Sequence, residues 1–188
     1  MEDFKNLQET QLSSQPIFDG DVLHIFKDTI RLPNGKQATR EYTVHHGAVC
    51  ILPLLENGDV LLEHQFRYPM GEVITEIPAG TLDYIGEDPA SAALRELREE
   101  TGVEPIDENS CDIDHVGQFY SSEGMTDELA NIMVVHLRHW QAVERHFDAD
   151  EHVESAWIPW KQLRDTHITA SNSEIAILHE QIRRMRQQ

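Results

Sequence analysis

The stretch that decides the fold runs from Gly80 to Val103 and reads GTLDYIGEDPASAALRELREETGV. Its second half carries the signals of a short helix. Asp88 is a good N-cap residue, and Pro89 suits the first helical position. Gly102 can adopt the left-handed conformation that ends a helix. The sequence therefore predicts a helix from about Pro89 to Thr101, entered from a glycine-containing loop.

This helix has an apolar face and an acidic face. Residues three and four positions apart share one side of a helix, and an apolar stripe of this kind packs on a sheet. The stripe consists of Ala90, Ala93, Leu94 and Leu97. The acidic face consists of Glu96, Glu99 and Glu100. Like charges at this spacing destabilise a helix by a few tenths of a kcal/mol per pair, so we expect a positive partner nearby.

A divalent cation is the partner that the chemistry of the acidic face favours. Mg²⁺ prefers oxygen ligands and usually combines one or two carboxylates with substrate phosphates. Arg95 precedes the cluster and can hold a glutamate through a charge-assisted hydrogen bond. The alternative is a solvated helix face with Arg98 as counter-charge, and glutamates alone would favour that alternative. The caps, the spacing and the loop together favour the cation.

The same stretch resembles the Nudix box of the Nudix hydrolases. The residues from Arg95 to Val103 fit the second half of that pattern without exception, and Glu87 stands at the expected distance before Arg95. Six residues separate Gly80 from Glu87, where the pattern has five, so the loop carries a one-residue insertion. Gly86 can absorb it because glycine tolerates positive φ. The insertion leaves the position of Glu87 open.

Further segments are similar to one Nudix subgroup, the ADP-ribose pyrophosphatases and related nucleoside diphosphate sugar hydrolases. These segments are 40–49, 65–69 and 76–80. The resemblance implies that Arg67 and Arg40 bind substrate. A guanidinium can grip a phosphate or stack on a base, but both arginines could equally be surface residues of a strand, and Arg40 is nearer to that alternative.

The resemblance also implies the roles of the box residues. Glu96 and Glu100 would hold the metal beside the backbone carbonyl of Ala79. Glu99 would assist, and Arg95 would orient the glutamates. The implied ion is Mg²⁺, with Mn²⁺ as the alternative.

A polar loop from Tyr120 to Glu128 is the expected source of the general base. In the subgroup this loop begins Ser-Pro-Gly and ends in a glutamate that activates water. Here Glu123 replaces the proline, which weakens the assignment to ADP-ribose. Glu128 is the expected base, with Glu123 and Asp127 as alternatives. An acidic surface loop without a catalytic role is the other interpretation.

Composition excludes several classes of function. The 188 residues suit one domain with a small N-terminal addition. Fifteen basic and 34 acidic residues give a net charge of −19, which disfavours nucleic acids and anionic membranes as partners. Cys50 and Cys111 have no spacing that indicates a disulfide framework or a zinc site. The sequence has neither a signal-peptide pattern nor an apolar run of membrane-spanning length, and we expect a cytoplasmic protein.

The expected fold is α/β (α+β), a Nudix fold with a mixed β-sheet sandwiched between helices. Residues 1–16 are expected to be a polar tail or flanking helix, and residues 17–45 a small antiparallel sheet. Residues 46–188 would form the Nudix domain. By resemblance, the N-terminal sheet pairs subunits into a homodimer. Near the C-terminus we expect an acidic turn at 148–152 and a last helix capped by Ser173.

The expected reaction is metal-dependent hydrolysis of a nucleoside diphosphate linked to another group. ADP-ribose is the first choice of substrate, with AMP and ribose 5-phosphate as products. GDP-mannose or another nucleotide sugar is the alternative within enzymes, because residues outside the box select the base and the sugar. A module that senses a nucleotide without cutting it is the alternative of another class. Such a module could lose box glutamates, whereas all of them are present here.

Overall fold

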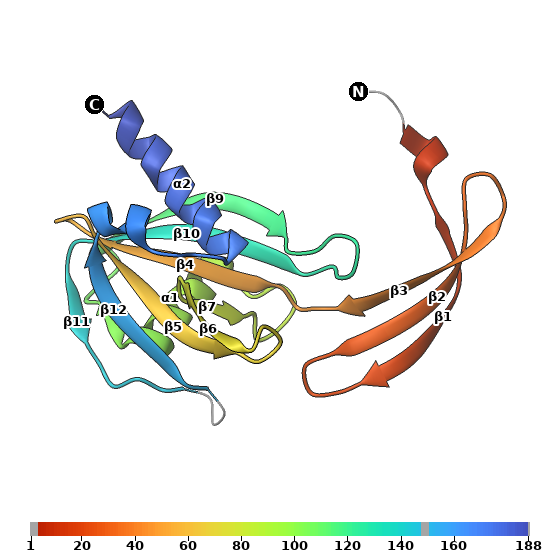
Figure 1. The fold of residues 1–188 in the computed structure, drawn as a ribbon, viewed down its shortest axis with the longest axis horizontal. Coiled ribbons are helices and arrows are strands. Elements are labelled where there is room, and N and C mark those ends of the chain that lie inside the picture. The colour runs from red at the N-terminus through yellow and green to blue at the C-terminus, as the bar shows by residue number, and fades with distance from the viewer. Residues whose placement is uncertain (1–3, 148–150, 188) are drawn as a thin grey trace. The chain divides into compact units, whose positions relative to one another are not determined.

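The computed structural model describes residues 4–147 and 151–187, which form two compact units (Figure 1). The N-terminal unit combines the chain up to His45 with the loop Tyr120–Glu128. It begins with a short 3-10 helix, η1 (Phe4–Leu7), and contains an antiparallel sheet in the order β1-β2-β3. The strands are β1 (Thr10–Asp19), β2 (His24–Arg31) and β3 (Gln37–Val44). The predicted small antiparallel sheet is therefore confirmed.

The start of this sheet differs from the expectation. Strand β1 begins at Thr10, within the segment 1–16 that was expected to be a polar tail or flanking helix. The sequence of β1, TQLSSQPIFD, does not alternate between apolar and polar residues, so no periodicity predicts the strand. All its side chains are exposed. Backbone pairing with β2 holds it, together with a 2.6 Å hydrogen bond from Gln11 Nε2 to Asp28 Oδ2.

The loop of the N-terminal unit lies along the end of β3. The Thr43 amide donates to the Met125 carbonyl at 2.9 Å, and the His45 amide donates to Asp127 Oδ1 at 2.8 Å. These bonds join two segments that are far apart in the sequence: His45 and Asp127 are separated by 82 positions. The Asp127 carboxylate thus binds the backbone just after β3.

The second unit is built on a seven-stranded mixed sheet, with the order β12-β5-β4-β10-β9 and with β6 on β5 and β7 on β4. Strand β4 is parallel to β10 and antiparallel to β5 and β7. The strands are β4 (Ala48–Leu55), β5 (Asp59–Arg67), β6 (Glu72–Glu76), β7 (Ala79–Thr81), β9 (Cys111–Tyr120), β10 (Leu129–Leu137) and β12 (Val153–Pro159). A separate pair is formed by β8 (Val103–Pro105) and β11 (Trp140–Ala142).

One helix covers each face of this sheet (Figure 1). Alternate residues of a strand point to opposite faces, and β4 shows this. Val49 and Ile51 pack in the core under α1 (Pro89–Thr101), whereas Cys50 and Leu52 pack in the core under α2 (Ser171–Arg186). The strand is buried on both sides, as expected for a central strand between two layers. The predicted sheet between helices is confirmed.

Helix α1 has the predicted bounds and caps. Asp88 accepts a hydrogen bond from the Ser91 amide at 3.0 Å, and Gly102 has a φ of 70°. A Cβ at Gly102 would lie 2.6 Å from the Val143 carbonyl oxygen, so this position excludes other residues on two grounds.

The buried stripe of α1 is displaced from the predicted one. Ala92, Ala93 and Leu97 are fully buried, whereas Ala90 and Leu94 are half-buried. Periodicity alone cannot tell which side of a run of alanines faces the sheet. The displacement brings the glutamates at the C-terminal end of the stripe to the edge of the core.

The start of the last helix also differs from the expectation. Helix α2 begins at Ser171, and Ser173 does not cap it. Ser173 is buried and accepts a hydrogen bond from the Ile77 amide at 3.0 Å, so it satisfies a backbone group between β6 and β7 instead. A short 3-10 helix, η2 (Trp160–Asp165), precedes it. Of the expected acidic turn at 148–152, residues 148–150 lie outside the described residues.

Across residues 4–147 and 151–187, the structure has no helix that is both long and apolar enough to cross a membrane.

Candidate active site

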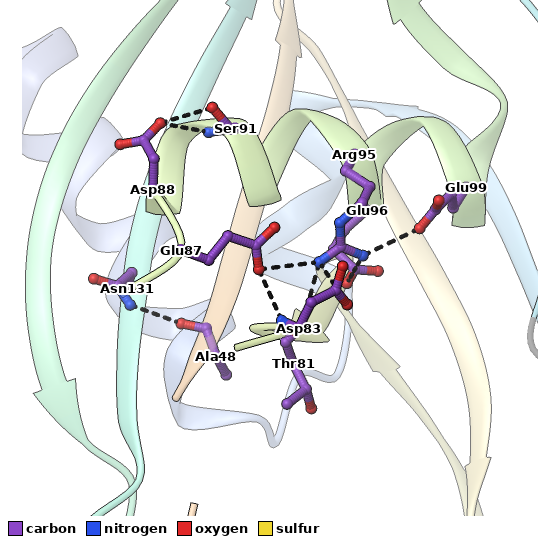
Figure 2. Close-up of polar contacts among 10 residues, drawn as sticks. All are labelled: Ala48, Thr81, Asp83, Glu87, Asp88, Ser91, Arg95, Glu96, Glu99 and Asn131. Atoms are coloured by element: carbon purple, nitrogen blue, oxygen red, sulfur yellow. Dashed lines mark hydrogen bonds and ion pairs between the residues drawn. The ribbon is translucent and has the colours of Figure 1, made fainter. Parts of the chain in front are cut away.

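Arg95 is the organising residue of the acidic face of α1 (Figure 2). Its Nη1 donates to Glu96 Oε1 at 2.7 Å and to Glu99 Oε2 at 3.2 Å. The side chain of Glu96 is 12% exposed and that of Arg95 is 27% exposed, so these charge-assisted bonds lie largely out of water. Arg95 thus bonds to two of the three glutamates of this face.

The loop before α1 also closes onto Arg95. Asp83 Oδ1 lies 3.4 Å and Glu87 Oε2 lies 3.5 Å from Arg95 Nη2. Glu87 Oε2 in turn accepts a hydrogen bond from the Asp83 amide at 2.8 Å. Gly86 has a φ of 92°, so glycine takes the turn in which the longer loop is accommodated. The extra residue therefore leaves Glu87 beside Arg95.

Gly80 gives Glu96 the space that its carboxylate occupies. A Cβ at Gly80 would lie 2.0 Å from Glu96 Cδ and 2.2 Å from Oε1. The φ of Gly80 is not positive, so its role is close approach and not a special backbone conformation. The glycine of β7 and the glutamate of α1 therefore form one fitted pair.

Glu100 lies one turn further along α1 and is 5% exposed. Its Oε2 accepts a hydrogen bond from the Ala79 amide at 3.2 Å. Ala79 is the first residue of β7 and pairs with Cys50 of β4, so the sheet fixes its backbone. The structure thus brings Ala79, Glu96 and Glu100 together at the junction of α1 and β7.

The carboxylates of this site are difficult to ionise without a further positive charge. Burial raises the pKa of Glu96 to about 7, against the opposing effect of Arg95. Burial also raises the pKa of Glu100, and the charge of Glu63 adds to the increase. Burial lowers the pKa of Arg95, but Glu96 and Glu99 outweigh it and raise that pKa above its usual value. Arg95 is therefore always charged, and it does not neutralise Glu100.

A divalent cation fits this donor set. Within the described ranges, no three His, Cys, Asp or Glu side chains converge into a ready-made metal cage. Mg²⁺ does not need one, because it binds through one or two carboxylates together with water and substrate phosphates. The donors here are all oxygens, and a cation would offset both the burial and the repulsion that raise the pKa of Glu100. The residues that could hold the ion are Glu96, Glu100 and the backbone of Ala79.

The remaining predicted site residues belong to other elements than α1 and β7. Arg67, on β5, donates from Nε to Glu76 Oε1 at 2.8 Å and keeps 38% of its side chain exposed. Arg40 belongs to the N-terminal unit and is paired there with Glu9 at 3.0 Å through its Nε. Arg40 has the surroundings of a strand arginine on the surface.

Glu128 also belongs to the N-terminal unit. The Ser121 hydroxyl donates to Glu128 Oε2, and the Glu128 amide donates to Thr126 Oγ1 at 3.1 Å. The first bond orients the carboxylate without neutralising it, and the second fixes the backbone at the end of the loop.

Sequence reasoning missed two buried glutamates near this site. Glu63 of β5 is 3% exposed, and Glu76 of β6 is 8% exposed and lies directly opposite it. The signal for Glu63 was a single charged residue at the end of the apolar run Val60–Leu62. An acidic residue at that place in a central strand indicates a buried carboxylate, which requires a partner.

Comparison with known protein families identifies the family to which this chain belongs. The NUDIX domain matches residues 44–178, and the nucleoside diphosphate sugar hydrolase N-terminal domain matches residues 9–43. The chain therefore belongs to the Nudix family and is a Nudix hydrolase.

Individual relatives agree with this assignment. An ADP-ribose pyrophosphatase of Bacillus subtilis (strain 168) is 37% identical over 150 residues, which cover 80% of this chain and 78% of the relative. A methanol dehydrogenase activator of Bacillus methanolicus is 31% identical over 183 residues, which cover 95% of each chain. The crystal structure of an ADP compounds hydrolase superposes with a TM-score of 0.75 at 18% identity, covering 95% of this chain and 96% of that one. That likeness establishes the fold.

Proposed function

We propose that this Nudix hydrolase cleaves the pyrophosphate bond of ADP-ribose, releasing AMP and ribose 5-phosphate. The observation that carries the proposal is the complete box helix, on which Arg95 fixes two glutamates while Glu100 is buried and forms no ion pair among the described residues. The ADP-ribose pyrophosphatase of Bacillus subtilis, matched over most of both chains, supports this choice of substrate.

The mechanism follows from the charge of the substrate. A pyrophosphate is anionic, so water attacks it readily only when positive charge neutralises its oxygens and the leaving group. A bound divalent cation, Mg²⁺ or Mn²⁺, would supply that charge. Glu96, Glu100 and the carbonyl of Ala79 would hold the ion, and Arg95 would keep the carboxylates in position.

Substrate binding and proton transfer need groups beyond the box. We propose that Arg67 binds the substrate, because its exposed guanidinium edge can pair with a phosphate while Glu76 holds its Nε. Arg40 is a further candidate for substrate binding. Glu128 would accept the proton of the attacking water, with Glu123 and Asp127 as the neighbours that could replace it. The hydrogen bond of Asp127 to the His45 amide favours Glu128 over Asp127.

Assembly is part of the same proposal. We expect a homodimer in which the N-terminal sheets pair subunits, since the match to the nucleoside diphosphate sugar hydrolase N-terminal domain covers that sheet. Size-exclusion chromatography with light scattering measures this directly. A monomeric mass at micromolar concentration would contradict it.

Product formation from a panel of substrates tests the function. The panel contains ADP-ribose, GDP-mannose, UDP-glucose and a diadenosine polyphosphate, each with Mg²⁺ or with EDTA, and chromatography separates the products. We expect Mg²⁺-dependent AMP from ADP-ribose, at a rate well above that from the other compounds. A faster reaction with GDP-mannose would show that the preferred substrate is a nucleotide sugar other than ADP-ribose. Tight binding of ADP-ribose without product would instead indicate a nucleotide-sensing module.

Glu100→Gln is the matched variant for this assay. The substitution removes the charge and keeps the shape, so the helix should fold while turnover falls by about a thousandfold or more, on the scale of losing a charged group that stabilises the transition state. Circular dichroism controls for folding. A near-normal rate in folded Glu100→Gln would remove Glu100 from the site.

A further inference from the structure

Strand β5 places a carboxylate where an apolar side chain is expected. Glu63 follows Val60, Leu61 and Leu62 and is as buried as they are, at 3% exposure. Its Oε1 has no hydrogen-bond donor anywhere in the described part of the chain. A buried carboxylate whose oxygen has no hydrogen-bond partner destabilises the fold if it is ionised. An aliphatic residue would fill this position without that penalty, so Glu63 requires a reason other than packing.

Strand alternation shows which layer the Glu63 side chain faces. Leu62 packs in the core under α2, whereas Leu61 packs in the core under α1. Glu63 is two residues after Leu61, so it also faces α1. The ion pair between Arg67 and Glu76 supports the assignment, because both positions share the face of Glu63 in the pairing of β5 with β6. Glu63 therefore points into the layer that contains Glu100.

The strand neighbours of Glu63 are polar residues. Glu76 of β6 and Ser155 of β12 lie directly opposite it on the two flanking strands. Ser155 Oγ is buried and, among residues 4–147 and 151–187, has no hydrogen-bond partner either. Two oxygens without a hydrogen-bond partner thus lie on neighbouring strands, on the face of the sheet that α1 covers. Unsatisfied oxygens in a polar recess are the atoms that a hydrated cation can satisfy.

Electrostatics connects Glu63 with Glu100. Burial raises the pKa of Glu63, and the charges of Glu76 and Glu151 raise it further, while Arg145 and Arg67 oppose them. Burial raises the pKa of Glu100, and the charge of Glu63 is the next largest cause. The two carboxylates are therefore close enough to repel each other, and Arg67, whose Nε is bonded to Glu76, offsets the charge of Glu63 only in part.

We propose that Glu63 is a further carboxylate of the divalent-cation site, binding the cation with Glu100 either directly or through a water of its hydration shell. The inference rests on the proposed metal-dependent function and adds to it a residue outside the box. Mg²⁺ retains several waters, so a carboxylate one water away still contributes to affinity. Ser155 Oγ would donate to Glu63 or to that water.

Binding of Mn²⁺ alone, without substrate, tests the proposal. Free Mn²⁺ is measured by electron paramagnetic resonance during titration of the wild type, Glu63→Gln and Glu154→Gln. Glu154 is the matched control, because it neighbours Ser155 on β12 but is exposed and pairs with His64 on the opposite face. We expect Glu63→Gln to weaken Mn²⁺ binding by about tenfold or more, the usual effect of losing a partner around a metal site. Glu154→Gln should remain within about twofold.

Thermal unfolding separates a cation-binding role from a structural one. In EDTA, Glu63→Gln should melt at the wild-type temperature or above it, because the cost of burying an ionisable carboxyl group is gone. With Mn²⁺ its melting temperature should rise less than that of the wild type. A variant that melts lower in EDTA and binds Mn²⁺ normally would show a structural role and overturn the proposal. Should Glu63→Gln not fold, Glu63→Asp carries the test, and normal Mn²⁺ affinity in it with an altered carboxylate position would overturn the direct contact.

The outcomes also distinguish this inference from the proposed function. Weaker Mn²⁺ binding by Glu63→Gln, with no hydrolysis of ADP-ribose by the wild type, would support Glu63 as part of the cation site. The same result would exclude ADP-ribose as the substrate. Hydrolysis of ADP-ribose by the wild type, with unchanged Mn²⁺ affinity in Glu63→Gln, would overturn the inference alone.

Discussion

Single residues of the box are fitted to one another by space as well as by charge. Arg95 forms ion pairs with the carboxylates of Asp83, Glu87, Glu96 and Glu99. One guanidinium cannot neutralise all of them, so negative charge remains for a cation. Gly80 permits this arrangement, because any side chain there would occupy the place of the Glu96 carboxylate.

Gly80→Ala should therefore damage the site more than the fold. The new Cβ meets the end of a flexible side chain, so Glu96 can rotate away, and we expect the free energy of unfolding to fall by no more than about 1 kcal/mol. Displacing the carboxylate of Glu96, a proposed metal ligand, by an ångström or more should lower kcat/KM about a hundredfold. Steady-state kinetics and urea denaturation measure the two effects. A large loss of stability with intact kinetics would contradict the steric role.

At the scale of the element, α1 is a short helix whose ends are specified locally. Asp88 accepts from both the amide and the hydroxyl of Ser91, at 3.0 and 2.8 Å. These bonds hold the pKa of Asp88 below its usual value, because the Ser91 hydroxyl and amide stabilise the carboxylate. The first turn of α1 thus has a fixed position. Because the helix is rigid, the position of the glutamates two turns later is fixed as well.

Asp88→Ala should lower the free energy of unfolding by about 1 kcal/mol, the usual effect of losing an N-cap. Asp88→Asn is the matched control, since asparagine caps about as well, and it should retain most of the stability. Urea denaturation at neutral pH measures both variants. Equal losses in the two would show that the charge, and not the cap geometry, matters here.

At the scale of the molecule, a buried ion cluster joins the end of α2 to the sheet. Glu180 is fully buried and accepts from Arg183 Nε at 2.6 Å and from Arg184 Nε at 2.7 Å. Arg184 also lies 4.0 Å over the ring of Trp160, and His136 Nε2 of β10 lies 4.0 Å from Glu180 Oε2. The cluster fixes α2 on one layer while α1 is fixed on the other.

Removing Glu180 should make the protein less stable in a pH-dependent way. Burial alone would raise the pKa of Glu180, but Arg183 and Arg184 outweigh burial and hold it below the usual value. The stabilisation is therefore complete above the unfolded value of 4.5 and is lost as pH falls through the lowered folded pKa. We expect Glu180→Gln to lower the free energy of unfolding by about 2 kcal/mol at neutral pH, since both arginines can partly turn to water.

Urea denaturation at about pH 7, 5.5 and 4 measures this difference, with exposed Glu174→Gln as the control. The difference between Glu180→Gln and the wild type should stay constant from pH 7 to 5.5 and begin to narrow towards pH 4. A difference that grows on acidification would contradict a lowered pKa.

Local signals were sufficient for much of the fold and less of the site. The helix 89–101, its caps and the hold of Arg95 on glutamates were predicted, because capping and neighbours one turn apart depend only on nearby residues. Strand β1 was not predicted from Thr10 onward, because backbone pairing leaves no local pattern in the sequence. The role of Ser173 was not predicted either, because its hydrogen-bond partner lies 96 positions away. The roles of Arg67, Arg40 and Glu128 stay predictions.

The sequence by itself determined the class of enzyme, since the box is one continuous segment whose spacing carries its chemistry. Only the tertiary structure decided that Gly80 makes room for Glu96, that Ala79 meets Glu100, and that Glu63 joins the same layer from β5. These residues are 16 or more positions apart along the chain. Their proximity follows from how strands pair and which face each side chain takes, and burial then raises the pKa of their carboxyl groups above the usual value.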